Sequence, residues 1–504
     1  MFDDIVAKDR GLMERWFAAD FSEPSYLVAR WIWLRALGGI FFSAFYSLYF
    51  QIHGLIGPNG ILPATAYLDA VRRAFGLKRY WFAPTLLWID AGDRALDVIV
   101  WAGLAASVAI IFNLWPRVSI AIAGICFLSF IAAAQDFASY QSDGMLLEAA
   151  LLSIFFAPRG FRPGLGRDRP PSRASLFMLR WEWFRIYFES GVVKLLSGEQ
   201  QWRNLTAMDK YYENGPLPSW IGWYVQQWPH SFHAASAAPT LILELFIAWM
   251  VFLPKWPRRF AFIITTPLQI GIILTANYAF LNYLVLSLGF LLLDDGVAQT
   301  LLSVRAPAGV PVPQRPSYAQ AIILPIVFVT TVAAFFMPYF PTVVLLEPFR
   351  VANTYGLFAV MTRARYDIEF QGTADGKTWL AYPFRYKPQN VRKPPGIYAP
   401  YQPRFEWNLW FASLGTWTDN RWVLNTEVRL LQNQPAVLQL FAGNPFPQKP
   451  PAAIRAVQWQ YWFTTPEERR RTGAWWHREL LGQYAPTAKR MPDGTIEFES
   501  TERP

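Results

Sequence analysis

Cysteine and charge are both scarce in this chain of 504 residues. Cys126 is the only cysteine, so no disulfide can form within the chain. Asp, Glu, Lys and Arg together make up 16% of the residues, against roughly 25% in soluble domains. Hydrophobic residues reach 53% and aromatic residues 17%. This composition excludes a disordered chain and disfavours an ordinary soluble enzyme.

The common catalytic and cofactor motifs are missing as well. The sequence contains no HExxH, no paired CxxC, no GxxxxGK[ST], no GxGxxG before a helix and no GxSxG. His230 and His233 are three residues apart, but no acidic residue or cysteine stands nearby in the sequence to complete a metal site. We therefore expect no metal and no cofactor. The basic clusters lie beside apolar runs, which favours contact with lipid headgroups and not with nucleic acid.

Long apolar runs are what the sequence has instead. A membrane span needs about 20 mostly apolar residues. Nine windows approach or meet this length, and they predict an all-α polytopic membrane helix bundle of about 8–9 spans with a C-terminal extramembrane α+β domain. The windows are 27–52, 94–115, 117–135, 139–157, 176–197, 236–254, 259–276, 277–293 and 318–340.

The windows also divide the chain. Residues 1–25 mix charged and apolar side chains and have no cleavage site, which is typical of an amphipathic helix on the membrane surface. Residues 26–345 form the predicted transmembrane bundle. Residues 346–487 form the predicted extracytoplasmic domain, and 488–504 a loose polar tail.

Within the C-terminal domain, the alternating stretch over 349–390 contains Asp375-Gly376, a hairpin signal, and predicts a small β unit. Segments 406–440 and 451–482 are rich in aromatic residues and are predicted to be helical.

The distribution of Lys and Arg sets the expected orientation. The short loops on the N-terminal side hold most of these residues, so that side is expected in the cytoplasm. Nine spans then place the C-terminal domain in the periplasm of a bacterium, or in the ER lumen of a eukaryote. Four basic residues within 72–79 oppose this pattern, and we interpret them as part of a surface helix docked on lipid headgroups.

The fifth window carries five ionisable residues, which are costly inside a membrane and are therefore candidates for function. Arg185 and Glu189 are i,i+4 neighbours and are expected to pair. Other polar groups fall at the same end of the bundle. They form either a polar cavity open to the non-cytoplasmic side or a network of paired charges that fixes helix register. The residues concerned are Arg180, Glu182, Arg185, Glu189 and Lys194, with His53, Asp136, Gln141, Asp143, Glu148, Asn277 and Asn282.

Lys194 has two readings. In a pocket of low dielectric constant a lysine can act as a base. Alternatively, Lys194 extends to the membrane interface or pairs with Asp143 or Glu148.

Several stretches of the sequence resemble the lipase maturation factor family. The most specific are LRALGGIFFSAFYSLYFQIHGLIGPNGILPA at 34–64, QDFASYQSDGMLLEAALLSIFFAP at 135–158 and LRWEWFRIYFESGVVKLLSGEQQWRNLTAMDKYYENGPLP at 179–218. Others are VANTYGLFAVMT at 351–362 and FTTPEERRRTGAWWHREL at 463–480.

The resemblance implies a membrane-embedded folding factor. Animal members reside in the ER and help dimeric lipases to reach their active state, and their C-terminal region faces the lumen and is implicated in client contact. The partners expected from it are the lipid bilayer and an exported client protein such as a lipase. The short N-terminus and the absence of disulfides and of a retention signal are typical of a bacterial inner-membrane protein.

The two groups of residues expected to bind under this interpretation differ in place. Those expected to contact the client are Trp407, Trp410, Phe411, Trp475 and Trp476. Those expected to bind within the bundle are His53, Arg180, Arg185, Glu189, Trp202, Arg203, Asn277 and Asn282.

A second resemblance concerns mechanism. YFESGVVKLLSGEQQW is similar to the segment of vitamin K-dependent gamma-carboxylase that holds its catalytic lysine, and Lys194 falls on that lysine. Two functions follow as hypotheses. One is a maturation factor without catalysis. The alternative is an intramembrane enzyme with Lys194 as base, Asp143 and Glu148 tuning it, and Asn277 and Asn282 binding substrate.

Overall fold

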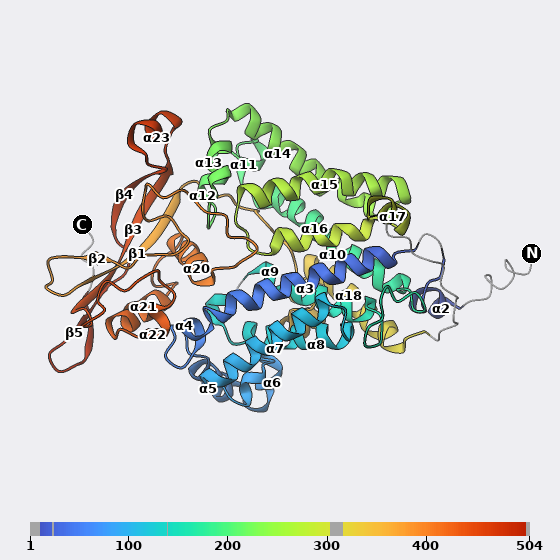
Figure 1. Cartoon of the computed structure of the whole chain (residues 1–504), viewed down its shortest axis with the longest axis horizontal. Coiled ribbons are helices and arrows are strands. Elements are labelled where there is room, and N and C mark those ends of the chain that lie inside the picture. Colours follow the sequence, from blue (N-terminus) through green and yellow to red (C-terminus); the bar gives the residue numbers. More distant parts are fainter. Residues whose placement is uncertain (1–10, 23–24, 139, 303–315, 500–504) are drawn as a thin grey trace, which may run out of the picture.

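The structure is a computed structural model, and it describes residues 11–22, 25–138, 140–302 and 316–499. It is mostly helical and has one antiparallel sheet near the C-terminus. Figure 1 shows the sheet at one end of the long axis and helix α2 at the other. Of the predicted surface helix over 1–25, residues 1–10 and 23–24 lie outside the described residues, and helix α2 covers Leu12–Phe17.

Each of the nine apolar windows contains a helix. We call residues 11–349 the helical part. Its further elements are α3 (Leu27–Tyr49), α4 (Ile52–Ile56), α5 (Ala64–Phe75), η1 (Gly76–Lys78), α6 (Arg79–Phe82), η2 (Leu86–Trp88), α7 (Asp93–Ile111), α8 (Pro116–Ile131), η3 (Gln135–Ala138), α9 (Gln141–Phe156), α10 (Arg173–Leu196), α11 (Gln200–Arg203), α12 (Tyr211–Asn214), α13 (Trp220–Gln226), α14 (His230–Leu245), η4 (Ile247–Phe252), α15 (Lys255–Thr275), α16 (Leu281–Gly289), η5 (Phe290–Leu292), α17 (Asp295–Leu302), α18 (Tyr318–Phe336), α19 (Pro341–Leu346) and η6 (Glu347–Phe349).

Four stretches of the described chain are long and apolar enough to cross a membrane: α3, α7, α14 with η4, and α18. The prediction of eight or nine spans is therefore not confirmed. Helices α8 and α16 are apolar but short, and α10 carries six charged side chains that lower its hydropathy.

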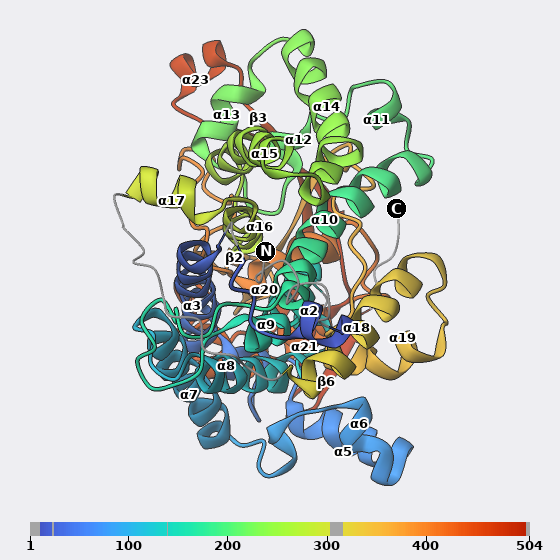
Figure 2. The same ribbon diagram turned by 90° about the vertical axis from the view of Figure 1, so that its right-hand side faces the viewer.

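Helices α9 and α10 lie near the middle of the helical part when it is viewed along the long axis (Figure 2), and most of their residues are buried. Helix α10 begins after Ser172, whose hydroxyl accepts a hydrogen bond from the amide of Ser175 at 3.2 Å. It ends just before Gly198, which adopts the left-handed conformation (φ +77°) that stops helices. The sequence thus sets both ends of the helix that carries the buried charges.

We call residues 365–499 the C-terminal lobe. Its six strands are all antiparallel, with the order β2-β1-β3-β5-β6, and β4 also pairs with β3. The elements are β1 (Arg365–Thr373), β2 (Leu380–Ala381), α20 (Arg404–Ser413), α21 (Trp422–Leu431), α22 (Pro435–Leu438), β3 (Ala453–Phe463), α23 (Pro466–Thr472), β4 (Trp476–Gln483), β5 (Thr487–Arg490) and β6 (Ile496–Glu499).

Two predictions for this lobe are confirmed and two are wrong. The hairpin at Asp375-Gly376 joins β1 and β2, and helices occupy 406–440. Segment 451–482, predicted as helical, instead contains strands β3 and β4 and the short helix α23. The tail predicted to be loose from residue 488 pairs as β5 and β6 around a turn that ends at Gly494, and only 500–504 lie outside the described residues.

The lobe packs directly on the end of the helical part where α3 finishes, with α20 beside η3 and α22 against α4 (Figure 1). The approach at α4 is close: a Cβ atom on Gly54 would lie 2.5 Å from the carbonyl oxygen of Ala436. The backbones of α4 and α22 meet there because glycine has no side chain.

Candidate functional site

A buried ionic cluster lies between α9 and α10. The Arg185 guanidinium pairs with the Glu148 carboxylate, and its Nη1 lies 3.9 Å from Oε1 of Glu189. All three side chains are at most 3% exposed. The predicted contact between Arg185 and Glu189 is confirmed, but the partner that Arg185 touches most closely comes from the neighbouring helix.

This cluster holds the chain that leads to the lobe. Tyr355 donates its hydroxyl to Glu148 Oε2 at 2.8 Å and its backbone N–H to Glu189 Oε2 at 2.7 Å. Arg185 Nη1 donates to the carbonyl oxygen of Asn353 at 2.7 Å. Asn353 and Tyr355 were not predicted as site residues. The only feature of the sequence that pointed to them was the stretch VANTYGLFAVMT at 351–362, which resembles the lipase maturation factor family.

Asp143 makes a second link of the same kind. Its carboxylate receives two hydrogen bonds from Arg404 of α20, at 2.8 and 2.7 Å, and Arg404 also donates to the carbonyl oxygen of Phe137 at 2.9 Å. Neither side chain of the pair is exposed by more than 1%. Asp143 is therefore occupied by an arginine from the lobe.

Lys194 pairs with Glu244 of α14, with its Nζ 2.6 Å and 2.8 Å from the two carboxylate oxygens. The expectation that Asp143 or Glu148 pairs with Lys194 or tunes it is wrong, because each of those carboxylates binds a different arginine. Glu244 was missed, although an acidic residue inside the run TLILELF was a usable signal.

A small cavity of about 70 Å³ adjoins this pair. Asn282 lines it and donates to Gln269 at 2.8 Å, and Gln269 donates in turn to the hydroxyl of Tyr187 at 2.8 Å. The polar groups beside Lys194 are thus already hydrogen-bonded to one another.

The remaining residues predicted to bind within the bundle contact the protein itself. Asn277 accepts hydrogen bonds from the amides of Tyr398 and Ala399 and donates to two backbone carbonyls, so it fixes a loop of the lobe. The others donate to carbonyl oxygens: Arg180 to Leu291, Trp202 to Phe358 and Arg203 to Leu195, all at 2.8–2.9 Å.

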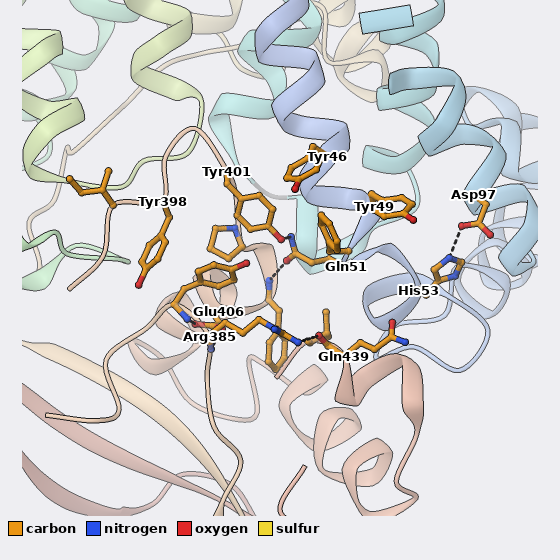
Figure 3. Close-up of a pocket in the computed structure, with 16 residues that line it drawn as sticks. Tyr46, Tyr49, Gln51, His53, Asp97, Arg385, Tyr398, Tyr401, Glu406 and Gln439 are labelled. Atoms are coloured by element: carbon orange, nitrogen blue, oxygen red, sulfur yellow. Dashed lines mark hydrogen bonds and ion pairs between the residues drawn. The ribbon is translucent and has the colours of Figure 1, made fainter. Parts of the chain in front are cut away.

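A cavity of about 850 Å³ lies where the lobe meets the end of α3 (Figure 3). Aromatic rings form much of its wall, and they come from both parts of the chain. The helical part supplies Tyr46, Tyr49 and Phe50, and the lobe supplies Tyr386, Tyr398 and Tyr401.

Polar groups line the rest of this junction cavity. Glu406 accepts hydrogen bonds from the backbone amides of Arg385, Tyr386 and Lys387 at 2.6–2.9 Å, which fixes the loop that carries Arg385. Figure 3 shows Arg385 extended toward Gln439, to whose carbonyl oxygen it donates at 3.1 Å. The cavity therefore combines aromatic surface with a cation held mainly by its neighbours' backbone.

His53 lies at the edge of the cavity between two carboxylates. Its Nδ1 is 2.8 Å from Asp93 and its Nε2 is 2.8 Å from Asp97. Burial opposes protonation of the imidazole, but the hydrogen bonds to the two carboxylates outweigh it and raise the pKa of His53. Doubly protonated imidazole can donate to both carboxylates at once.

The five aromatic residues predicted to contact a client do not form one exposed surface. Trp407, Trp410 and Trp476 are at most 7% exposed, because they pack inside the lobe and against the helical part, and Phe411 is 47% exposed. Trp475 stacks on the Arg469 guanidinium at 3.5 Å. Trp407, Trp410 and Phe411 line a second cavity of about 590 Å³.

The structure combines three features: a core of buried ion pairs, long apolar helices around this core, and a sheet-containing lobe on one end. These features are typical of a membrane-anchored protein, and a cavity lies at the junction of its two parts. Comparisons with known families agree with this class. The profile of the lipase maturation factor transmembrane domain matches residues 28–300, and that of the lipase maturation factor C-terminal domain matches residues 351–486.

Curated relatives cover almost the whole chain. Lipase maturation factor 1 of Bos taurus is 30% identical over 93% of this chain and 90% of its own length. Lipase maturation factor 2 of Mus musculus is 28% identical over 93% of this chain and 84% of its own length. Lipase maturation factor 1 of Homo sapiens is 28% identical over 92% and 88% respectively. No solved structure matches the chain.

The chain belongs to the lipase maturation factor family, as the sequence had indicated, and it is a membrane protein.

Proposed function

We propose that this protein is a membrane-bound maturation factor that helps an exported client, a lipase above all, to reach its active fold. The names of its relatives support a role in lipase maturation. The observation that carries the proposal is the junction cavity, because both family regions contribute to its wall.

The wall of the cavity suits a segment of a partly folded protein. Such a segment exposes apolar side chains together with backbone donors and acceptors. Aromatic rings can bind the apolar side chains, and the side chains of Arg385 and Gln439 can bind the backbone donors and acceptors. In this proposal the lobe lies outside the cytoplasm, as the Lys and Arg distribution predicts, where an exported client would meet it.

The intramembrane enzyme is the weaker hypothesis. It requires Asp143 and Glu148 to act on Lys194, and both carboxylates are paired elsewhere. Lys194 itself has a carboxylate partner in Glu244.

The test is to express the full chain together with a secreted lipase from the same genome, in a host that lacks lipase maturation factors. The enzymatic activity per mass of secreted lipase is measured with and without the chain, and it should rise when the chain is present. Equal specific activity in both hosts would refute the proposal.

A cavity variant makes the test specific. Tyr398→Ala combined with Tyr401→Ala removes two rings from the wall, and Tyr318→Ala removes an exposed ring elsewhere as the matched control. We expect the double variant to lose the gain in lipase activity while its amount in the membrane stays that of the control. If the double variant matures lipase as well as Tyr318→Ala does, the junction cavity is not the client site.

A further inference from the structure

The segment that joins α4 to α7 exposes many large apolar side chains without forming a span. Helices α5 and α6 and the short turns η1 and η2 make up this segment. Two of its side chains are almost fully exposed, Leu77 at 83% and Ile89 at 88%. Its other exposed large apolar side chains, at 41–52%, are Phe75, Tyr80, Trp81, Phe82 and Leu86.

Cations are interleaved with these apolar side chains. Arg72, Arg73, Lys78 and Arg79 lie within eight positions of one another. Arg72 pairs with Asp69 at 2.8 Å and Arg79 stacks on the ring of Tyr80 at 4.5 Å. Within the described ranges of the chain, no ion pair engages Arg73 or Lys78.

A distant segment extends the same surface. The chain after α18 exposes Phe336 at 71%, Met337 at 58% and Tyr339 at 90%. Trp81 joins the two segments, because its Nε1 donates to the carbonyl oxygen of Leu345 at 2.9 Å and its ring lies 4.8 Å from that of Phe349. We call residues 72–89 and 336–349 together the peripheral patch.

The peripheral patch lies at one level of the molecule. Its first segment belongs to the connection between the end of α3 and the start of α7, and α18 ends at the start of the second segment. These are three of the four stretches able to cross a membrane. Figure 2 places α5 and α6 at the rim of the molecule, outside the ring of longer helices.

Exposed aromatic and aliphatic side chains mixed with unpaired cations, at the ends of spans, match the boundary between acyl chains and headgroups. We propose that the peripheral patch lies in the leaflet on the side of the lobe and binds anionic lipid headgroups there. The apolar side chains enter the acyl boundary and the four cations contact phosphate. A client protein could bind the peripheral patch instead of lipid. Such a client would need acidic side chains placed opposite Arg73 and Lys78, whereas an anionic leaflet offers negative charge at every position.

The first experiment measures depth in the membrane. Cys126 is buried and is the only cysteine, so a Cys126→Ala chain accepts a single spin label at a chosen site. The label is placed at Leu77→Cys, with Lys377→Cys in the exposed hairpin turn of the lobe as control. The full chain is reconstituted into vesicles of phosphatidylcholine with a minority of phosphatidylglycerol, and collisions with oxygen and with a water-soluble nickel chelate are compared.

We expect the label at 77 to collide more with oxygen, which dissolves in the bilayer, and the label at 377 to collide more with the nickel chelate. A label at 77 that meets the chelate as freely as the label at 377 does would overturn the proposal. So would a label at 77 that is shielded from both reagents only after a secreted lipase is added, because the surface would then be a protein-docking site.

The second experiment tests the preference for anionic headgroups. Arg72, Arg73, Lys78 and Arg79 are changed to Gln together, and the control neutralises four exposed cations of the lobe, namely Lys377, Lys449, Arg470 and Arg471. The ratio of phosphatidylglycerol to phosphatidylcholine that remains with the purified chain is measured. Each cation at an anionic surface contributes about a fivefold preference, so the first variant should lose at least that factor and the control should not. An equal ratio in the two variants would refute anionic selectivity. This result is independent of whether the chain matures lipases.

Discussion

Replacing Arg404 by methionine removes the cation that joins the lobe to the helical part. Methionine keeps the long side chain but leaves the Asp143 carboxylate, which is 1% exposed, without its two charge-assisted hydrogen bonds. Breaking one side of a buried ion pair costs about 3–5 kcal/mol, since the remaining charge stays buried without compensation. We expect the free energy that holds α20 against the helical part to fall by that amount.

Hydrogen exchange of the backbone amides of α20 measures this loss without unfolding the membrane helices. A loss of about 3–5 kcal/mol corresponds to exchange that is roughly 10²–10⁴ times faster. Arg429→Met is the matched control within the lobe, because Arg429 makes one hydrogen bond to the carbonyl oxygen of Gly60, at 2.9 Å, and its loss should cost only about 1 kcal/mol.

The double variant Asp143→Leu with Arg404→Met separates the two possible causes. If the unpaired carboxylate is responsible, replacing both partners by apolar side chains should restore most of the protection. If the double variant exchanges as fast as Arg404→Met alone, the cost arises from lost packing around the arginine, and the reasoning from buried charge is refuted.

Three further changes test other parts of the structure. Burial raises the pKa of Glu427 in the lobe, so the folded protein releases this proton at a higher pH than an unfolded glutamate, whose pKa is about 4.3. The lobe therefore loses stability as the pH rises above that value, and Glu427→Gln should raise the Tm at pH 8 more than at pH 5. An equal gain at both pH values would contradict this. Gly54→Ala should destabilise the contact of α4 with α22 by about 1–3 kcal/mol, because the backbone oxygen of Ala436 cannot move aside easily. If hydrogen exchange of the backbone amides of α22 is unchanged in this variant, the two backbones are not in such close contact. Lys194→Met should lower the thermal stability of the membrane-embedded chain, because Glu244 is left buried without its cation, and adding Glu244→Leu should restore this stability. If the stable double variant no longer increases the specific activity of the secreted lipase, the result would favour the enzyme hypothesis instead.

The positions of the helices were readable from the sequence because apolar run length is a direct property of the residues. Whether each helix spans a membrane was not. Helix α10 is 24 residues long, but Arg185 and Lys194 on it pair with carboxylates of the neighbouring helices α9 and α14. The expected count of eight or nine spans rested on apolar run length, and four stretches of the described chain are both long and apolar enough to cross a membrane.

The strands β3 and β4 were missed for a physical reason. Strand β3 lies in the interior of the sheet, between β1 on one side and β4 and β5 on the other, and most of its residues are buried on both faces. Residues 457–461 alternate as VQWQY, but the residues on both sides of them do not, and the aromatic-rich segment 451–482 as a whole is not distinguished from a helix by periodicity. The hairpin at Asp375-Gly376 was found because its turn has its own local chemistry.

Partners within the site were predictable only where one helix supplied both. The spacing of Arg185 and Glu189 fixes their proximity. The partners of Lys194 and Asp143 are set by how helices pack and how the lobe docks, and they lie 50 and 261 residues away along the chain. Lys194 and Asp143 were therefore predicted as site residues, but their partners Glu244 and Arg404 were not.

The buried charges of the helical part have a consequence for experiments that divide the protein at the family boundary. Glu148 and Glu189 bind Tyr355, Asp143 binds Arg404, and Glu213 accepts the backbone N–H of Phe463 at 2.7 Å. A chain cut after Pro348 would keep the carboxylates and lose all of these partners. Asp143 would be buried without its ion-pair partner, at a cost of several kcal/mol. Glu148 and Glu189 would keep Arg185 but lose their hydrogen bonds to Tyr355, so the shortened helical part would be destabilised. Loss of lipase maturation in such a truncation would therefore not locate the client site in the lobe, whereas point changes in the junction cavity leave the ionic links in place and can.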